Sequence, residues 1–569
     1  MREGASLAPN GAAAIETLYE RHFIKRGDMT NRVPANIAET AFDLVIIGAG
    51  INGAGIARDA AMRGLRVLLV DKGDIGGGTT SWSTRLIHGG LRYLQYRELR
   101  LVRESLRERE ILLRIAPHLV RPLTFLIPIY ESGRRGPLMI RAGMFAYDLL
   151  SFDKSLPAHR ILTREEALRQ LPELNRKGLR GAAVYHDAQV EFAERLAVEN
   201  VLAAREKGAV VLTYARVRQF IIENDIVRGV EFTDEIDGTA GSARGRIVVN
   251  AAGPWVDQLL ENTGRRSQRL IGGTKGSHII VGEFAGAPAS ALYVEAKADQ
   301  RPFFIIPWNG NYLIGTTDIR YEGDLDRVEI DEGEIGYLLS ETNRVIPSAN
   351  LARNSILFTY SGVRPLPYIN DKDEQSITRR HFIREQSAFD GLISIVGGKL
   401  TTYRNLAEQT VDLIAHKLGR RLPRSATAEK PLPGAQCPDF VAFSDGFKRE
   451  SGLPGIASER LLRIYGTRAR EVLKLVSEDR SLAEIYSTES GAMAAEVVFS
   501  FEYEMARTLS DCLLRRTMVG LNSSMGARDD EVAARVAQMH LGWSKTRAEE
   551  EVRAYRRYIE RFQPRWRSL

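Results

Sequence analysis

The sequence predicts an α/β domain in its N-terminal part and a helical domain at its C-terminal end. Two apolar runs of strand length, residues 42–47 (FDLVII) and 66–70 (RVLLV), flank a segment with helical periodicity at residues 51–63. From about Pro423 the pattern changes to a Pro-rich stretch followed by helical segments such as residues 457–479. The length of 569 residues is enough for two or three domains of ordinary size.

Composition and charge indicate a globular protein that favours anionic partners. Hydrophobic residues make up 44% of the chain and charged residues 27%, which is typical of a soluble protein. The net charge of +7 favours a phosphorylated substrate, an anionic lipid surface or nucleic acid. Nucleic-acid binding has no other support, because the basic residues are spread along the chain and no known binding module occurs.

The cysteines and the apolar runs indicate the cellular compartment and whether a membrane-spanning segment is expected. Cys437 and Cys512 form no CxxC pair, so inert thiols in a reducing compartment are expected. No apolar run approaches the roughly 18 residues of a membrane span, and the N-terminus lacks the apolar core of a signal peptide. Residues 1–40 are expected to form an extension outside the main fold, with one short helix over residues 14–23.

A glycine fingerprint joins the first strand to the first helix. Gly48, Gly50 and Gly53 fit the pattern G-x-G-x-x-G. The first glycine permits a tight turn, the second lets the backbone approach a pyrophosphate, and the third lets the helix lie close to the strand. Asp71 ends the next strand, where a carboxylate would accept the hydroxyls of an adenosine ribose. This strand–helix–strand context predicts dinucleotide binding.

The fingerprint fits either NAD or FAD, and three later segments favour FAD. Residues 246–255 (RIVVNAAGPW) form an apolar strand that stops on small residues, as a strand end beside a cofactor would. Residues 391–414 are typical of a strand, a Gly-Gly turn and a helix whose N-terminus could face the flavin pyrimidine ring. Residues 81–95 (SWSTRLIHGGLRYLQ) add a second Gly-Gly pair among arginines. A small nicotinamide domain would not need contacts spread over so much of the chain.

Together these segments resemble the FAD-dependent glycerol-3-phosphate dehydrogenases of the aerobic, respiratory type. The resemblance covers about nine tenths of the chain, and residues 1–40 have no counterpart in it. The matching motifs are IIGAGINGAGIARDAAMRGLRVLLVDKGD, TRLIHGGLRYLQYRELRLVRESLRERE, NAAGPW, KGSHI, GTTD, GVRPL, GGKLTTYR and, near the C-terminus, TLSDCLLRRTM.

The resemblance implies the fold and the cofactor site. It implies a Rossmann-like α/β domain for FAD, assembled from separated pieces, and an antiparallel-sheet substrate domain. Both would be interleaved over residues 41–420, with an all-helical domain over residues 421–569. The cofactor-binding residues would be Gly48, Gly50, Gly53, Asp71, Ser81, Gly89, Gly90, Ala251, Gly253, Thr316, Gly397 and Gly398, and no metal is expected. Gly89 and Gly90 would run beside the flavin, where a side chain would collide with it.

The resemblance also implies the reaction, which is oxidation of sn-glycerol 3-phosphate to dihydroxyacetone phosphate with hydride transfer to flavin N5. Arg92 and Arg379 would anchor the phosphate and Tyr93 would orient the substrate. Arg364 and Lys399 would stabilise the substrate oxygens, and His278 is the candidate proton acceptor. His88 is interpreted as a structural hydrogen-bonding residue.

A membrane quinone is the electron acceptor that the resemblance implies. Two basic and apolar segments, residues 99–119 and 135–150, could form a peripheral contact with an anionic bilayer. An ordinary amphipathic helix packed on the core is the alternative. The expected location is the cytoplasmic face of the cell membrane, and a homodimer is possible.

Three alternatives stay open. The enzyme could pass electrons to oxygen as an oxidase, or it could act on a longer phosphorylated polyol. It could also be a non-catalytic flavin-binding sensor, although such a protein would be expected to lose its convergent cations.

Overall fold

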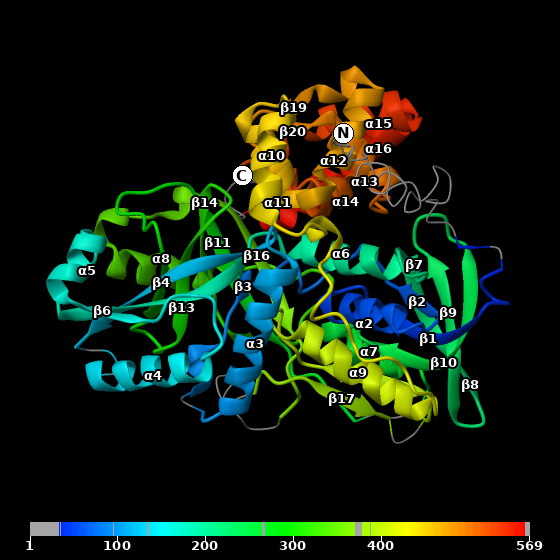
Figure 1. Cartoon of the computed structure of the whole chain (residues 1–569), viewed down its shortest axis with the longest axis horizontal. Helices are drawn as coiled ribbons and strands as arrows, with labels where there is room; N and C mark the ends of the chain where they lie inside the picture. The colour runs from blue at the N-terminus through cyan, green and yellow to red at the C-terminus, as the bar shows by residue number, and fades with distance from the viewer. Residues whose placement is uncertain are drawn as a thin grey trace, which may run out of the picture.

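The computed structural model describes residues 33–563 apart from residues 35, 95, 132, 134–135, 265–267, 370–377 and 387–388. Figure 1 shows two sheets side by side, with helices of the C-terminal part gathered over them. Most of the predicted N-terminal extension, including its short helix, lies outside the described residues. Residues 36–39 form a turn, and Ile37 is buried in the core next to the first strand.

The first sheet begins with the predicted strand–helix–strand unit. Strand β1 (Ala41–Ile47), helix α2 (Ile51–Met62) and strand β2 (Val67–Val70) follow one another, and β1 and β2 pair in parallel. Nearly every residue of both strands is buried, which explains why they are continuous apolar runs rather than alternating ones. The predicted α/β fold is confirmed in this unit.

Distant segments complete this sheet in the order β17-β18-β10-β1-β2-β7. Its further strands are β7 (Val210–Leu212), β8 (Ala215–Glu223), β9 (Ile226–Asp234), β10 (Ala240–Asn250), β17 (Phe382–Glu385) and β18 (Leu392–Val396). Strands β7, β2, β1, β10 and β18 run parallel, whereas β8, β9 and β17 are antiparallel additions. Helices α6 (Ala193–Arg205) and α9 (Tyr403–Lys417) pack against α2.

The second sheet has ten strands, in the order β15-β11-β14-β13-β12-β4-β6-β3, with β16 beside β11 and β5 beside β6. All its pairs are antiparallel except β12 with β4. Its strands are β3 (Leu86–Ile87), β4 (Val120–Tyr130), β5 (Arg160–Thr163), β6 (Leu179–Val190), β11 (Thr274–Val281), β12 (Ala291–Glu295), β13 (Pro302–Trp308), β14 (Asn311–Gly315), β15 (Ile319–Arg320) and β16 (Ile356–Arg364). Helices α5 (Arg164–Gln170), α7 (Val256–Glu261) and α8 (Glu332–Val345) lie between strands in the sequence.

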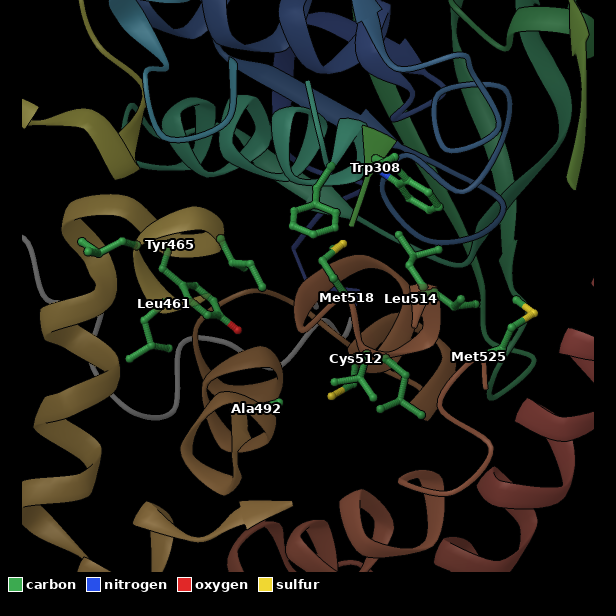
Figure 2. Close-up of a cluster of buried hydrophobic side chains, with 14 of the residues drawn as sticks. Trp308, Leu461, Tyr465, Ala492, Cys512, Leu514, Met518 and Met525 are labelled. Carbon is green, nitrogen blue, oxygen red and sulfur yellow. The ribbon is translucent and has the colours of Figure 1, made fainter. Parts of the chain in front are cut away.

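The C-terminal domain is helical apart from one small hairpin. Its helices are α10 (Phe440–Glu450), α11 (Gly455–Tyr465), α12 (Ala469–Glu478), α13 (Ala494–Glu502), α14 (Leu509–Asp511), α15 (Asp530–Leu541) and α16 (Lys545–Ile559), with a π-helical turn at Cys512–Arg516. The hairpin pairs β19 (Ile485–Ser487) with β20 (Ala492–Met493). Figure 2 shows Trp308 of the second sheet near Leu514 and Met518. These residues belong to one hydrophobic cluster, to which the second sheet and the C-terminal domain both contribute.

The Pro-rich stretch before this domain packs against helices α3 (Leu99–Ile115) and α6. The N–H of Leu432 donates to the carbonyl of Ile115, and the N–H of Gly434 donates to the buried Glu199 carboxylate. His118 bonds the same carboxylate at 3.0 Å. The stretch therefore joins the core of the first domain before the chain enters the C-terminal helices.

The two basic and apolar segments differ in exposure. Helix α3 (Leu99–Ile115) lies within the first of these segments and buries its apolar residues Leu101, Val102, Leu106, Ile111 and Leu112. That part of the membrane hypothesis is wrong, because these side chains face the core. Helix α4 (Pro137–Leu150) instead leaves large apolar side chains in solvent: Leu138 is 79% exposed, Phe145 66% and Leu149 65%. Phe152, just beyond its end, is 76% exposed.

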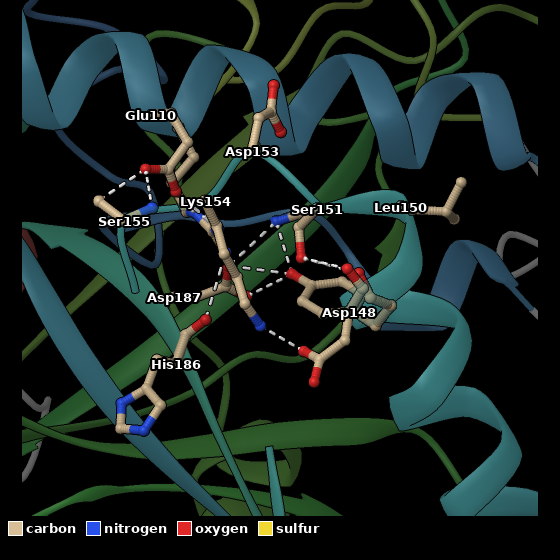
Figure 3. Close-up of polar contacts among 12 residues, drawn as sticks. Glu110, Asp148, Leu150, Ser151, Asp153, Lys154, Ser155, His186 and Asp187 are labelled. Carbon is tan, nitrogen blue, oxygen red and sulfur yellow. Dashed lines mark hydrogen bonds and ion pairs between the residues drawn. The ribbon is translucent and has the colours of Figure 1, made fainter. Parts of the chain in front are cut away.

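Polar contacts hold α4 to the core from its inner side (Figure 3). Tyr147 donates to the carboxylate of Asp187 on β6 at 2.7 Å. Ser155, in the loop after the helix, donates to Glu110 of α3 through both its N–H and its hydroxyl. The exposed apolar stripe is thus a fixed feature of the surface, and its side chains recur every three to four residues, together with Arg141.

Candidate active site

A cleft of about 1290 Å³ lies between the two sheets and reaches the C-terminal domain. It is bordered by the C-terminal ends of the parallel strands, where open α/β sheets bind their ligands. One wall comes from the loops after β1, β2, β10 and β18. The facing wall comes from β11 and β16 of the second sheet.

The glycine fingerprint lies at the floor of this cleft. Gly48 has a φ of +105°, and a Cβ there would lie 2.6 Å from the carbonyl oxygen of Ala251. A Cβ on Gly53 would lie 1.8 Å from the carbonyl oxygen of Gly48, so this glycine lets α2 lie against the turn. Gly50 precedes α2 and lines the cleft, with only ordinary contact to Thr80. The turn itself therefore requires Gly48 and Gly53, whereas Gly50 leaves its backbone open to the cleft.

Asp71 also lines the cleft, with its carboxylate partly engaged. It accepts hydrogen bonds from the N–H groups of Ala49 at 2.6 Å and Gly73 at 2.8 Å. Burial raises its pKa, although these two bonds oppose the shift. The carboxylate closes the fingerprint loop and still faces the space in which a ribose would lie.

The strand ends on the other side add small residues to the same wall. Ala251 and Gly253 follow β10 and line the cleft. Gly397 and Gly398 follow β18 with φ values of +76° and +99°. Asn52 of α2 donates to the carbonyl of Gly397, and its own side-chain oxygen is buried without a hydrogen-bond partner. Together with the glycine floor, these small residues allow a dinucleotide to approach the backbone along this wall of the cleft.

Two arginines converge on one carboxylate at the substrate side. Arg364 ends β16 and donates from Nη1 to Oδ1 of Asp318 at 3.0 Å. Arg379 donates from Nη2 to Oδ2 of the same residue at 2.8 Å. Burial opposes ionisation of Asp318, but the two guanidinium groups outweigh it and bring its pKa to about 2. Nη1 of Arg379 is buried and has no hydrogen-bond partner among the described residues, although Arg379 lines the cleft.

Gly276 makes room for the first of these arginines. It lies in the KGSHI motif of β11, directly across the sheet from Gly362 of β16. A Cβ on Gly276 would lie 2.1 Å from Nη2 of Arg364. Arg364 also donates from this nitrogen to the hydroxyl of Thr316 at 3.0 Å, and burial lowers its pKa to about 10.

Lys399 and Tyr93 lie together in the cleft. The ammonium nitrogen of Lys399 is 4.7 Å from the centre of the Tyr93 ring. It donates to the hydroxyl oxygen of Ser105 on α3 at 2.5 Å. Burial lowers the pKa of Lys399 to about 8, against the opposing charges of Glu104, Glu98 and Asp187.

His278 faces the same cleft from β11. Its Nε2 lies 3.0 Å from the hydroxyl oxygen of Thr84, and its Nδ1 is buried without a partner. Burial lowers its pKa well below the ordinary value, and the positive charges of Arg364 and Arg85 add to the shift. The imidazole is therefore neutral near pH 7 and able to accept a proton.

Four predicted site residues lie behind the cleft wall. A Cβ on Gly89 would meet the hydroxyl of Tyr147 at 2.4 Å, and one on Gly90 would meet the Tyr93 ring at 2.1 Å. Protein packing accounts for both glycines, and their contact with a flavin stays a prediction. The hydroxyl of Ser81 donates to the carbonyl of Gly76, and that of Thr316 to the carbonyl of Thr317.

The remaining predicted residues sit near the cleft in different ways. Arg92 does not line it, and its guanidinium carbon lies 5.8 Å from the centre of the Tyr96 ring. Its charge still acts on Tyr93 and Arg364. His88 lines the cleft, and burial lowers its pKa to about 4. Its backbone N–H donates to the hydroxyl oxygen of Thr401 at 3.2 Å.

Sequence reasoning missed several residues of the site. Asp318 is the last residue of the GTTD motif, and a carboxylate in the short link between two strands is the signal that could have identified it. Ser105, Thr84 and Gly276 carry no comparable signal, because a serine in a helix or a glycine in a strand is common. Their roles depend on which distant side chain they meet.

The C-terminal domain contributes to the cleft, which the sequence did not predict. Arg515 lines the cleft and donates to Asp74 at 2.5 Å and Asp511 at 2.7 Å. Arg516 forms two further bonds with Asp74, at 2.9 and 2.8 Å. Asp74 lies in the loop after β2, so this buried network fixes the C-terminal domain to the loop that carries Asp71.

Comparisons with known proteins agree with this geometry. Residues 43–404 match the sequence model of a family described as FAD dependent oxidoreductase. Residues 425–548 match a family described as the C-terminal domain of alpha-glycerophosphate oxidase. The two matches together cover both sheets and most of the C-terminal helices.

Several curated proteins are similar over nearly the whole chain. A glycerol-3-phosphate dehydrogenase of Synechocystis sp. is 47% identical over 538 residues, which are 92% of this chain and 97% of that protein. A D-erythritol 1-phosphate dehydrogenase of Brucella abortus is 39% identical over 493 residues, which are 84% and 94% of the two chains. A solved structure, the glycerol-3-phosphate dehydrogenase from Bacillus halodurans complexed with FAD, is 29% identical with a TM-score of 0.76 and covers 93% of this chain and 96% of that one.

Proposed function

Because the chain belongs to the family of FAD-dependent glycerol-3-phosphate dehydrogenases, we propose that it oxidises sn-glycerol 3-phosphate to dihydroxyacetone phosphate and passes the electrons to a membrane quinone. The observation that carries the proposal is the cluster of Arg379, Arg364 and Lys399 beside the dinucleotide cleft. Asp318 offsets one of these three positive charges, so the partly enclosed cluster keeps a net positive charge that favours an anionic ligand. A phosphate dianion is the group that would compensate this charge.

The cofactor is FAD, which accepts a hydride equivalent when it is bound. Gly48, Gly50 and Gly53 would hold its pyrophosphate against the start of α2. Asp71 would face the ribose, and the turn at Gly397 and Gly398 would lie against the ring system. Every contact of this kind needs a close backbone approach, which the small residues allow.

The substrate phosphate would bind to Arg379. Its Nη1 is a buried donor that has no partner within the described part of the chain, and a phosphate oxygen would satisfy it. Arg92 would contribute mainly through its charge, since its side chain does not line the cleft. Tyr93, whose ring lies against Lys399, would fix the orientation of the carbon chain.

The reacting hydroxyl would lie between Arg364, Lys399 and His278. The two cations would stabilise the negative charge that develops on the oxygen as its proton leaves. The neutral imidazole of His278 would accept that proton, and Thr84 would hold the ring by its bond to Nε2. Its lowered pKa keeps the ring unprotonated at neutral pH, and the position of His278 in the cleft wall is what places it for this role.

The exposed stripe of α4 would be the membrane contact. It carries Leu138, Phe145 and Leu149 beside the exposed Arg141, a combination that suits the headgroup region of an anionic bilayer. Among the described residues, no helix combines the length and the apolar composition needed to cross a bilayer. A surface contact of this kind would bring a quinone close to the loop that contains Gly89. The hydroxyl oxygen of Tyr147 on α4 accepts a hydrogen bond from the N–H of Gly89 at 3.0 Å.

A longer phosphorylated polyol is the second candidate substrate. The 39% identical Brucella relative, which is named a D-erythritol 1-phosphate dehydrogenase, supports it. The same cations would bind the phosphate of either substrate. The part of the cleft wall that limits the length of the substrate's carbon chain would determine which of the two substrates is accepted.

An anaerobic absorbance titration of the purified protein tests the proposal. Flavin bleaching by sn-glycerol 3-phosphate, and not by glycerol, is the expected result. Bleaching only by a four-carbon polyol phosphate would move the substrate to the second candidate. Bound flavin that no phosphorylated polyol bleaches would contradict the enzymatic function and favour a flavin-binding sensor.

A further inference from the structure

Asp318 is a buried carboxylate that contacts both arginines of the substrate side but lines no part of the cleft. Its side chain is 8% exposed. The residue follows β14 in the GTTD motif. A hydrogen bond from the Arg301 side chain to the backbone carbonyl of Asp318 holds the residue in place. Asp318 is therefore placed to act on the substrate through the arginines and not directly.

The two arginines come from separate segments of the chain. Arg364 ends β16, and Arg379 lies just before β17. Arg379 has no other ion pair among the described residues, so the carboxylate of Asp318 is the main constraint on its guanidinium. A guanidinium group is planar, with donors in a rigid fork. Fixing Nη2 on Asp318 therefore also fixes the direction of Nη1, the donor that is left for a ligand.

Each oxygen of Asp318 takes one arginine. Oδ1 accepts from Arg364 and Oδ2 accepts from Arg379, so the width of one carboxylate sets the separation of the two guanidinium groups. With its pKa of about 2, Asp318 stays ionised at every working pH and is a poor proton acceptor. Both of its oxygens are engaged by the arginines and it does not line the cleft, so Asp318 is not placed to act as the catalytic base.

We propose that Asp318 is a positioning residue, which holds Arg379 for the substrate phosphate and Arg364 for the reacting oxygen at a fixed separation. This inference rests on the proposed function, since it assigns the phosphate to Arg379. Without Asp318, each arginine would have to be ordered by the substrate itself, and the ordering would reduce the affinity. Removal of the Asp318 carboxylate should therefore raise KM, mainly because Arg379 is no longer held in place for the phosphate.

A double-mutant cycle of Asp318→Asn and Arg379→Ala tests this role. We expect Asp318→Asn alone to raise the KM for sn-glycerol 3-phosphate about 10- to 100-fold, the range for a lost charge-assisted hydrogen bond. In the Arg379→Ala background the same change should raise KM by less than about twofold, because the partner is already absent. Equal effects of Asp318→Asn in both backgrounds would overturn the proposal.

Two further variants separate positioning from a loss of folding. Glu341→Gln removes a buried carboxylate of the same domain that pairs with Arg344 at 2.7 Å outside the cleft, and it should leave KM unchanged. Asp318→Glu keeps the charge but moves it by one methylene, so it should raise KM with an unchanged Tm and flavin content. A normal KM for Asp318→Glu together with a low Tm for Asp318→Asn would indicate a purely structural role.

The outcomes also separate this inference from the proposed function. If glycerol 3-phosphate does not bleach the flavin of the wild-type protein, the proposed function fails. If it does, and Arg379→Ala raises KM while Asp318→Asn does not, only the positioning role fails.

Discussion

The ammonium group of Lys399 donates a hydrogen bond of 2.5 Å to the hydroxyl oxygen of Ser105, a residue 294 positions earlier in the chain. The Ser105 hydroxyl in turn donates to the carbonyl of Leu101 at 2.6 Å, so its oxygen is oriented to accept from the lysine. Lys399 follows the last glycine turn of the cofactor cleft, and Ser105 lies on the buried face of α3. This contact fixes the ammonium group, which also lies 4.7 Å from the centre of the Tyr93 ring.

The pH dependence of activity should follow the charge of Lys399. Burial lowers its pKa to about 8, so the free enzyme loses this positive charge as pH rises through that value. We expect kcat/KM to fall above about pH 8, because the charged form stabilises the substrate. Lys399→Arg keeps its charge to higher pH, and its alkaline limb should move upward. Initial rates from about pH 6 to about pH 10 would measure this, and an unchanged limb in Lys399→Arg would assign it to another group.

The adjacent arginines 379 and 380 should behave differently. Arg379 lines the cleft with an unpartnered donor, whereas Arg380 is exposed. We expect Arg379→Ala to raise the KM for sn-glycerol 3-phosphate about 10- to 100-fold with bound flavin retained. Arg380→Ala is the matched control and should change KM by less than about twofold. Steady-state kinetics with an artificial acceptor would measure both, and equal KM values would refute the phosphate assignment.

Gly276→Ala should displace Arg364. The new Cβ would lie 2.1 Å from its Nη2, so the guanidinium would have to leave its bond to Thr316. We expect kcat/KM to fall at least about tenfold. The free energy of unfolding should change by less than about 1 kcal/mol, because the guanidinium is the far end of a flexible side chain and can move aside. Gly282→Ala, just beyond the same strand, meets nothing within 4 Å and should leave both unchanged. Steady-state kinetics would measure kcat/KM of the two variants, and thermal unfolding would measure their stability.

His278→Gln should lower kcat and leave KM nearly unchanged. Loss of a proton acceptor typically costs about 100- to 10,000-fold in rate. Because the pKa of His278 is lowered, wild-type activity should show no acid limb near the ordinary value of about 6.5. His186→Gln is a suitable control, since His186 also bonds a threonine, Thr124, but lies outside the cleft. Stopped-flow flavin reduction would report the rate, and a full rate in His278→Gln would remove it as the base.

Membrane binding should depend on the exposed stripe of α4. We expect the paired change of Phe145→Ser and Leu149→Ser to weaken sedimentation with anionic vesicles, because each removed side chain is about two-thirds exposed and free to enter lipid. Val441→Ser with Ile456→Ser, exposed apolar residues of the C-terminal domain, is the control. High salt should weaken binding further through Arg141. Equal sedimentation of the two double variants would argue against α4.

Much of the fold could be predicted from local pattern. The first strand, helix and strand were expected at residues 42–47, 51–63 and 66–70, and they occur at Ala41–Ile47, Ile51–Met62 and Val67–Val70. The reason is that burial on both faces of a parallel strand and the spacing of the glycines leave a signal within a few residues. The helical C-terminal domain is also expected from periodicity, but its hairpin at β19 and β20 is too short to leave one.

The candidate site was predicted only as a set of residue types. His278, Arg364, Arg379, Lys399 and Tyr93 all line one cleft, as the resemblance implied. Their partners were not predictable, because Asp318 and Ser105 act through side chains far away in the sequence. The roles of all these residues stay predictions until the variants are measured.

The sequence by itself determined the α/β unit with its glycine turn, the family and the kinds of charged residue available for a phosphorylated substrate. Only the tertiary structure decided which charges meet, why Gly89 and Gly90 lack side chains, and that α3 is buried while α4 is exposed. The physical reason is that periodicity reveals the presence of an apolar face but not its neighbour. Pairing between residues hundreds of positions apart is set by how the two sheets and the C-terminal helices pack together.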